Sequence, residues 1–205
     1  MSFSAVNATA RDFYGFTLAM SYARLILAAC TKEALPDVQK TLPLRHAVTP
    51  LIDRYFSTIY LLLPIFEETS FFASVDAVYS ADNRRASAFD HWTLRMVLAI
   101  SSISQSEQRG DNYYADAIGH VNAALLLAEE VLHPGSVASI QALLLLVQYA
   151  MYDPHHLESW TIIGAASRAM VDLGMHQDPS KTSAMPRAKM ELRRRVYYCV
   201  YALDR

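Results

Sequence analysis

The segment from Val137 to Met151 constrains the fold more than any other, because it is apolar on nearly every side of a helix. Its apolar run is interrupted by Gln141 and Gln148 and is shorter than the roughly 18 residues that a membrane span requires. A helix that is apolar all round has to be covered by other parts of the protein. We therefore expect this helix at the centre of a packed domain, and we expect no transmembrane segment.

Apolar residues recur at helical spacing along most of the chain, whereas strand-like alternation is scarce. The pattern, punctuated by proline and glycine, predicts helices at 12–30, 50–64, 71–79, 91–104, 113–132, 137–151, 154–173 and from 187 into the end of the chain. The helix over 113–132 is expected to be unbroken and to form a hairpin with 137–151. The predicted fold class is all-α, with antiparallel helical hairpins packed in a bundle or a short solenoid-like array.

Four residues mark the expected ends of helices. Asp111 and Ser136 precede predicted helices as N-cap residues, whose side-chain oxygens accept backbone N–H groups. Asp153 repeats this signal, with proline at the first helical position, where a missing N–H costs nothing. Gly174 is expected to end that helix in the left-handed conformation.

Small residues follow Trp160 inside the helix predicted over 154–173. Gly164 and Ser167 come at helical spacing after the tryptophan, and small side chains beside a large one let a neighbouring helix approach closely. We expect a close helix crossing at these three residues. On this prediction Gly164→Leu would overpack the crossing and destabilise the fold by roughly 1 to 3 kcal/mol.

Composition excludes a disordered chain, since 53% of the residues are hydrophobic and only 19% are charged. The formal net charge of -2 gives no reason to expect non-specific attraction to a phosphate backbone. Cys30 and Cys199 lie far apart inside apolar stretches, which suits reduced thiols in an intracellular protein.

The tetrapeptide from Leu27 to Cys30 resembles the box at which bacterial lipoproteins are cleaved and lipidated. A secretory signal needs roughly 7 to 15 uninterrupted apolar residues before the cleavage site, but Arg24 leaves only a short run before the cysteine. We therefore interpret this segment as part of an ordinary buried helix and expect the protein not to be secreted.

Motifs of enzymes are absent from the sequence. It has no GxSxG elbow, no HExxH helix, no phosphate-binding loop and no glycine fingerprint, and its six glycines leave little material for such turns. Paired aspartates of the DDxxD type, which a helical terpenoid synthase requires, are also missing. An enzyme is therefore not predicted.

Residues 113–205 resemble the middle homology region of fungal binuclear zinc-cluster transcription factors. The motif pieces occur in the family's order and spacing: Tyr114-Ala115, then 139–145 (SIQALLL), 160–170 (WTIIGAASRAM), 172–176 (DLGMH), 191–198 (ELRRRVYY) and Leu203-Asp204-Arg205. Tyr55-Phe56 and the residues 63–66 (LPIF) resemble upstream segments of the family more loosely. The resemblance covers about three quarters of the chain.

The resemblance implies a helical regulatory domain that controls transcription by RNA polymerase II without itself contacting DNA. It divides the chain into an N-terminal helix and proline-containing loop (1–44) and the front part of the regulatory domain (45–205), truncated at its C-terminal end. The family-motif residues that it selects as structural or regulatory are Tyr114, Gln141, Trp160, Gly164, Arg168, Asp172, Gly174, His176, Arg195, Tyr197, Asp204 and Arg205.

The resemblance also sets expectations about cofactors and partners. The DNA-reading module of the family needs six closely spaced cysteines for two zinc ions, and this chain has two cysteines. We therefore expect no cofactor, metal or catalytic residue in this chain, with zinc and DNA bound only by a missing module. A small-molecule effector, a co-regulator protein and a homodimer are left open as partners, and the expected location is the nucleus, with room for a cytoplasmic pool.

Several residues that suggest a site have simpler structural interpretations. Adjacent His155 and His156 cannot easily chelate one ion, so a hydrogen-bonded helix start is favoured, and His176 suits a helix C-terminus. The triplet 193–195 (RRR), near Arg187 and Lys189, could form an import or phosphate patch, but Glu191 four residues before Arg195 favours a solvated ion pair. Tyrosines 197, 198 and 201 are expected mainly in the core, with part of the group lining a groove.

Two further functional hypotheses stand beside the regulatory domain. One is a protein-interaction scaffold of helical hairpins without an effector pocket. The other is an unrecognised helical enzyme. An apolar cavity with a few convergent polar groups would favour the regulatory domain, and an exposed concave groove would favour the scaffold.

Overall fold

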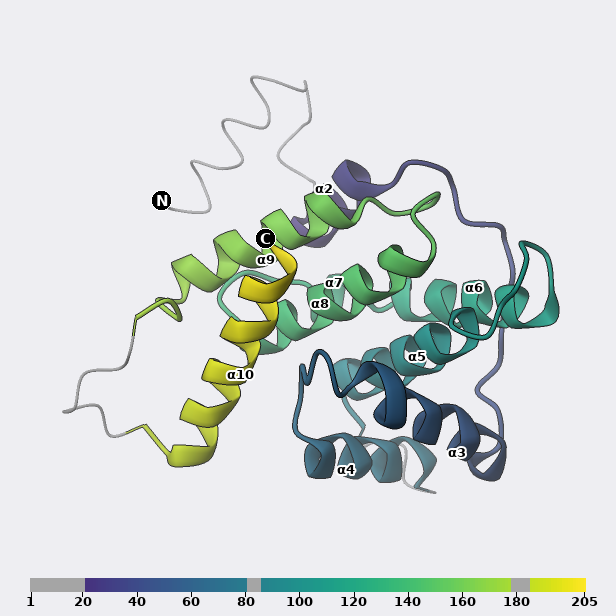
Figure 1. Cartoon of the computed structure of the whole chain (residues 1–205), viewed down its shortest axis with the longest axis horizontal. Coiled ribbons are helices and arrows are strands. Elements are labelled where there is room, and N and C mark those ends of the chain that lie inside the picture. The colour runs from purple at the N-terminus through teal and green to yellow at the C-terminus, as the bar shows by residue number, and fades with distance from the viewer. Residues whose placement is uncertain (1–20, 81–85, 178–184) are drawn as a thin grey trace.

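Helix α8 (Val137–Tyr152) lies at the centre of the computed structural model, because it has no polar face to leave in water (Figure 1). Every residue from Ser139 to Ala150 is buried. The structure describes residues 21–80, 86–177 and 185–205. Within them it contains α-helices, one π-helix and a single isolated β-bridge, and no sheet. The all-α prediction and the central position of this helix are confirmed.

Helices α5, α7, α9 and α10 pack directly on α8, and the remaining helices pack on these. Helix α5 packs along α6 and along α8, and α9 also packs along α8. Helices α3 and α4 lie on α5, α2 lies on α9 and α7, and α10 lies across α8 and α9 (Figure 1). The bounds are α2 Tyr22–Cys30, α3 Arg45–Arg54, η1 (the π-helix) Tyr55–Ile59, α4 Glu68–Tyr79, α5 Ala88–Ile103, α6 Asn112–Leu125, α7 Ala128–Val131, α9 Ser159–Asp172 and α10 Arg187–Leu203.

The hairpin predicted between 113–132 and 137–151 is wrong, because α6 pairs with α5 and α8 pairs with α5 and α9. The helix predicted over 113–132 is also broken: α6 ends at Leu125 and α7 begins at Ala128. Leu126 at the break is 77% exposed, whereas Ala128 and Val131 after it are buried. The break thus turns the following apolar residues toward the core.

The helix predicted from Pro50 to Pro64 begins five residues earlier and changes its form. Helix α3 starts at Arg45, which allows Val48 to be buried, and Pro50 lies inside it. The chain then continues as η1 instead of as a regular α-helix. Residues 12–20 of the first predicted helix lie outside the described residues, and so do residues 81–85 and 178–184, which fall between predicted helices.

Two of the four predicted helix-end signals work as expected. The carboxylate of Asp111 accepts a hydrogen bond from the backbone N–H of Tyr114 at 2.7 Å, and Gly174 has a φ of +63° after α9. Ser136 is the N-cap of α8, although its side chain makes no capping bond. These outcomes place the ends of three helices within one or two residues of the prediction.

The helix start predicted at Asp153 is wrong. Asp153 is the C-cap of α8, and α9 begins only at Ser159. The chain between α8 and α9 instead forms two hydrogen bonds with the end of α2. The backbone N–H of Lys32 donates to the carbonyl of His156 at 2.9 Å, and the backbone N–H of Glu158 donates to the carbonyl of Cys30 at 2.8 Å. These long-range bonds replace the first turn of the predicted helix.

The close crossing predicted at Trp160, Gly164 and Ser167 is absent. Trp160 is 81% exposed, and a methyl group added at Gly164 would meet only the side chain of Arg168, at 3.5 Å. The close approach occurs at Gly119 of α6, where an added Cβ would lie 2.6 Å from the Cβ of Lys40. The small-residue pattern on α9 therefore predicted a helix crossing that does not form, and the close contact at Gly119 is with the non-helical segment before α3.

Candidate functional site

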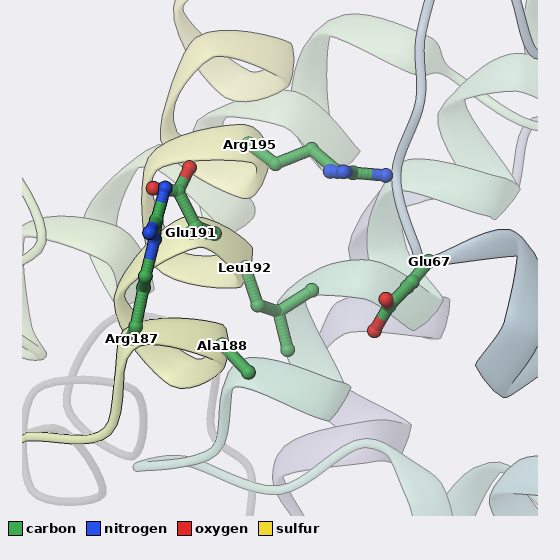
Figure 2. A pocket seen from close by; sticks show the side chains of 6 residues that line it. All are labelled: Glu67, Arg187, Ala188, Glu191, Leu192 and Arg195. Atoms are coloured by element: carbon green, nitrogen blue, oxygen red, sulfur yellow. The ribbon is translucent and has the colours of Figure 1, made fainter.

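Helix α10 packs on α8 and α9 and leaves an open groove between itself and the chain that leads into α4 (Figure 2). A hollow of about 350 Å³ and a second hollow of about 350 Å³ share three lining residues, so we treat them as one α10–α4 groove. Figure 2 shows Arg195 reaching from α10 toward the segment before α4, with Leu192 and Ala188 below it. The residues common to both hollows are Glu67, Ala188 and Leu192.

The floor of the groove is apolar and its rim is charged. The floor consists of Phe66 from the segment before α4, Phe71 of α4 and Phe89 of α5. Glu67 on one side and Arg187 on the other bring charges of both signs to the rim (Figure 2). This combination of an apolar floor with a few polar groups is typical of ligand and partner sites.

Arg195 holds α10 to the far wall of the groove. Its guanidinium donates to the hydroxyl of Tyr60 and to the carbonyl of Phe66, both at 3.1 Å. The Tyr60 hydroxyl in turn donates to the same carbonyl at 2.8 Å. Burial raises the pKa of Tyr60, although the charge of Arg195 acts in the opposite direction, so the phenol keeps its proton.

Gln141 of α8 holds the neighbouring peptide of the same segment. Its amide nitrogen donates to the carbonyl of Ile65 at 2.9 Å in a fully buried contact. Two family-motif residues that are far apart in the sequence, Gln141 and Arg195, therefore fix two consecutive carbonyl groups. Beneath them six aromatic rings pack with centroid separations of 4.7 to 6.4 Å: Tyr55, Phe56, Tyr60, Phe66, Phe71 and Phe72.

The predicted ion pair between Glu191 and Arg195 does not form. Arg195 bonds to the segment before α4 and not to Glu191, and Arg193 donates to the carbonyl of Leu173 at the end of α9, at 3.1 Å. Successive residues of a helix point in different directions, so these two arginines reach different neighbours. The sequence pattern identified the charged residues but not their backbone acceptors.

Arg168 and Asp172 lie at a different hollow, between α2 and α9. This α2–α9 groove has a volume of about 600 Å³ and includes Tyr22 of α2 on its opposite wall. Gly164 lies beside it, next to the guanidinium of Arg168. The structure therefore separates these motif residues from Gln141 and Arg195.

Tyr114 belongs to a buried polar network that the sequence did not predict. Its hydroxyl donates to Asp153 at 3.1 Å and lies 3.0 Å from Nε2 of His156, and the hydroxyl of Tyr149 also donates to Asp153, at 3.3 Å. Asp153 and His156 are 2% and 5% exposed. The helix start expected at the histidine pair is thus wrong, because His156 lies in the turn that joins α8 to α9. His156 is buried by hydrogen bonds to the end of α2, and the sequence around His156 gives no sign of such distant partners.

The last family-motif residues lie at the exposed face and end of α10. Tyr198 is 65% exposed and Tyr201 is 44% exposed, so the expectation that these rings lie in the core is wrong. Half-buried Tyr197 lines an open groove of about 560 Å³ with His176, whose side chain is exposed. Among the described helices, α10 packs mainly on α8 and α9, and the rings of Tyr198 and Tyr201 remain on its solvent-exposed side. At its end Asp204 is the C-cap, and the guanidinium of Arg205 lies 4.6 Å from the centre of the Tyr201 ring.

Metal-binding chemistry finds little support in the described residues. No group of three or more histidine, cysteine, aspartate or glutamate side chains in residues 21–80, 86–177 and 185–205 could hold a metal ion. Cys30 and Cys199 are free and buried, and burial raises the pKa of each thiol to about 11. At neutral pH these thiols keep their protons, whereas zinc requires thiolates. No described helix is long and apolar enough to cross a membrane.

Comparison with known proteins links the chain to regulators of transcription. Residues 52–205 match the family model described as fungal specific transcription factor domain. The chain is 25% identical to the "Positive regulator of purine utilization" of Emericella nidulans, over 80% of this chain and 21% of that protein. It is 27% identical to an "ABC-transporter-regulating transcription factor" of Aspergillus oryzae, over 82% of this chain and 19% of that protein.

A third relative agrees with the first two. The "Lactose regulatory protein LAC9" of Kluyveromyces lactis is 28% identical, over 77% of this chain and 17% of that protein. The chain therefore spans about a fifth of the length of these relatives. No solved structure matches it significantly.

Proposed function

Because the chain belongs to the family of fungal specific transcription factor domains, we propose that it is the regulatory part of a zinc-cluster transcription factor. In this proposal it controls transcription by RNA polymerase II in response to an effector or a partner protein. A separate zinc-cluster module contacts DNA, and the protein acts in the nucleus, with a cytoplasmic pool left open. The names of the relatives, which describe a positive regulator, a transcription factor and a regulatory protein, support this proposal.

The electrostatics of the chain support a role that does not involve direct DNA contact. Its net charge is -2, and two of the arginines that could have formed a phosphate-binding patch, Arg193 and Arg195, donate to backbone carbonyls. Specific recognition of DNA needs side chains that are organised to contact base edges. Regulation therefore acts through conformation or partners.

The observation that carries the proposal is the contact of Arg195 with the segment before α4. This side chain joins the two walls of the α10–α4 groove. A ligand or partner that enters the groove competes with those bonds or wedges α10 away from α4. Such a movement is a physical route from binding to a changed position of α10.

A scaffold that binds a partner protein is the second candidate function, and it rests on exposed aromatic side chains. Trp160 on α9 and Tyr198 on α10 are 81% and 65% exposed. Tryptophan and tyrosine are enriched at the energetic centres of protein interfaces. The open form of the grooves also suits a partner's side chains.

A reporter assay tests the regulatory role. The chain is placed between a heterologous DNA-binding module and an activation segment, and transcription of a reporter gene is measured at matched protein levels. We expect Arg195→Ala, which breaks the contact between the walls, and Ala188→Trp, which fills the groove, to change the output. Ala188 is exposed, so its substitution leaves the core intact.

Arg24→Ala is the matched control. It removes one arginine from an exposed ion pair with Glu129, outside the groove. The proposal predicts unchanged output for this variant. Equal output from all three variants and the unaltered chain, with intact helical circular dichroism, would contradict a regulatory role for the α10–α4 groove.

A further inference from the structure

A further open groove lies between η1 and the end of α8. It has a volume of about 420 Å³, and we call it the η1–α8 groove. Its walls are mostly apolar and include Leu62, which is 80% exposed, and Met151, which is 59% exposed. Ile59 and Tyr152 add further apolar surface, and Gln148 also lines it. Ligand sites commonly have volumes of roughly 300 to 1,000 Å³.

Gln148 gives this groove a specific chemical character. The side chain is 2% exposed, and its amide nitrogen has no hydrogen-bond partner. Its amide oxygen accepts a hydrogen bond from the hydroxyl of Tyr55 at 3.0 Å. Burial raises the pKa of Tyr55, so the phenol keeps its proton and remains the donor. In this arrangement the amide nitrogen of Gln148 is the unpaired donor.

An unpaired buried donor is costly, so its presence in a lined groove needs an explanation. Gln141 is the natural comparison, because it lies two turns earlier on the same helix and faces the same part of the chain. There the amide nitrogen donates to the carbonyl of Ile65. Gln148 has the same chemistry but lacks that acceptor.

The backbone on the opposite wall is also unusual. The groove is lined by Thr58 and Ile59 of η1, and π-helical turns occur frequently at functional sites. The hydroxyl of Thr58 donates to the carbonyl of Arg54 at 2.6 Å. Among the buried polar atoms of the described residues that line the groove, the amide nitrogen of Gln148 is the one without a hydrogen-bond partner.

We propose that the η1–α8 groove binds a small, largely apolar molecule with one hydrogen-bond acceptor, such as a ketone. The apolar walls hold the hydrocarbon part, and the acceptor takes the hydrogen bond from the amide nitrogen of Gln148. The inference rests on the proposed function in one respect, because such a molecule would be the effector of the regulatory domain. Binding itself does not depend on transcription and is measured on the purified chain.

The test uses two probes of nearly the same shape, benzophenone and diphenylmethane, which differ in a carbonyl group. Binding is followed by the side-chain amide resonances of Gln148 and Gln141 in ¹H–¹⁵N spectra. We expect benzophenone to shift the Gln148 amide protons and to bind roughly threefold to tenfold more tightly than diphenylmethane, as one hydrogen bond allows. The Gln141 amide serves as the internal control and is expected not to move.

Two variants separate the contribution of the hydrogen bond to binding from that of the apolar walls. Tyr55→Phe combined with Gln148→Leu removes both polar partners together, and the preference for the ketone is then expected to vanish. Leu62→Asp alters an exposed wall residue and is expected to weaken both probes, which keeps the test decisive if the double variant fails to fold.

Absence of binding by both probes, equal affinity for the two, or shifts at Gln141 in place of Gln148 would overturn the proposal. An unchanged reporter output despite specific binding of benzophenone at Gln148 would instead count against the effector role. The failure of the binding site and the failure of the proposed function are therefore distinguishable.

Discussion

Helices α8 and α9 are neighbours in the chain and in space, and both carry family-motif residues, but they use them differently. Every residue of α8 from Ser139 to Ala150 is buried, and its motif residue Gln141 holds a backbone carbonyl. On α9 the motif residues Trp160 and Arg168 are exposed. The difference indicates that one part of the motif maintains the fold, while another part remains available at the surface.

The largest expected effect is on stability, and it compares a side-chain truncation in α8 with one in α9. Leu144 of α8 is fully buried, so Leu144→Ala should leave a cavity and lower the free energy of unfolding by about 2–5 kcal/mol. Val171→Ala on the half-exposed side of α9 should change it by less than about 0.5 kcal/mol. Urea unfolding measures both. Similar losses for the two variants would show that the helices are equally buried.

The next effect concerns the two glutamines of α8. Gln141→Leu removes the donor to the buried carbonyl of Ile65 and should cost about 1–3 kcal/mol of unfolding free energy, because that acceptor is left unpaired. Tyr55→Phe with Gln148→Leu removes a donor and an acceptor together and should cost less than about 1 kcal/mol. If the double variant loses more stability than Gln141→Leu, the amide nitrogen of Gln148 has a partner.

Features that depend on residues close together in the sequence could be predicted, and features that depend on distant residues could not. The burial of α8 and the end of α9 at Gly174 depend on residues within the helix or next to it, and both were predicted correctly. The wrong helix start at Asp153 depends on bonds between 156–158 and the end of α2, more than a hundred residues away. Local patterns carry no information about such partners.

The candidate site shows the same limit. The family motif selected Gln141 and Arg195 without revealing that they bind consecutive carbonyl groups before α4. In the sequence Gln148 is recognisable only as an interruption of an apolar run, because its partner Tyr55 lies ninety-three positions earlier in the chain. The exposed rings of α10 were assigned to the core because helical spacing alone cannot say which faces find a neighbour.

A smaller effect on stability is expected at Gly164, where the predicted close helix crossing was wrong. Gly164→Ala should raise the free energy of unfolding by about 0.5–1 kcal/mol, because alanine favours a helix interior and its methyl group meets only the side chain of Arg168. Gly119→Ala is the matched control in another helix, where the new Cβ would lie 2.6 Å from that of Lys40 and should destabilise. Thermal melting of both distinguishes them. A loss of stability at Gly164 would restore the predicted close crossing.

The smallest expected effect on stability belongs to Trp160. Because its side chain is 81% exposed at the start of α9, Trp160→Ala should change the free energy of unfolding by less than about 0.5 kcal/mol. The chain has one other tryptophan, Trp92, which is fully buried in α5. Acrylamide should therefore quench the fluorescence of Trp160 in the unaltered chain. The variant has only Trp92, whose buried side chain should be protected from the quencher. If Trp160→Ala lowers the melting temperature substantially, or if its fluorescence is quenched as strongly as that of the unaltered chain, then α9 does not present this side chain to solvent, and its contrast with α8 is lost.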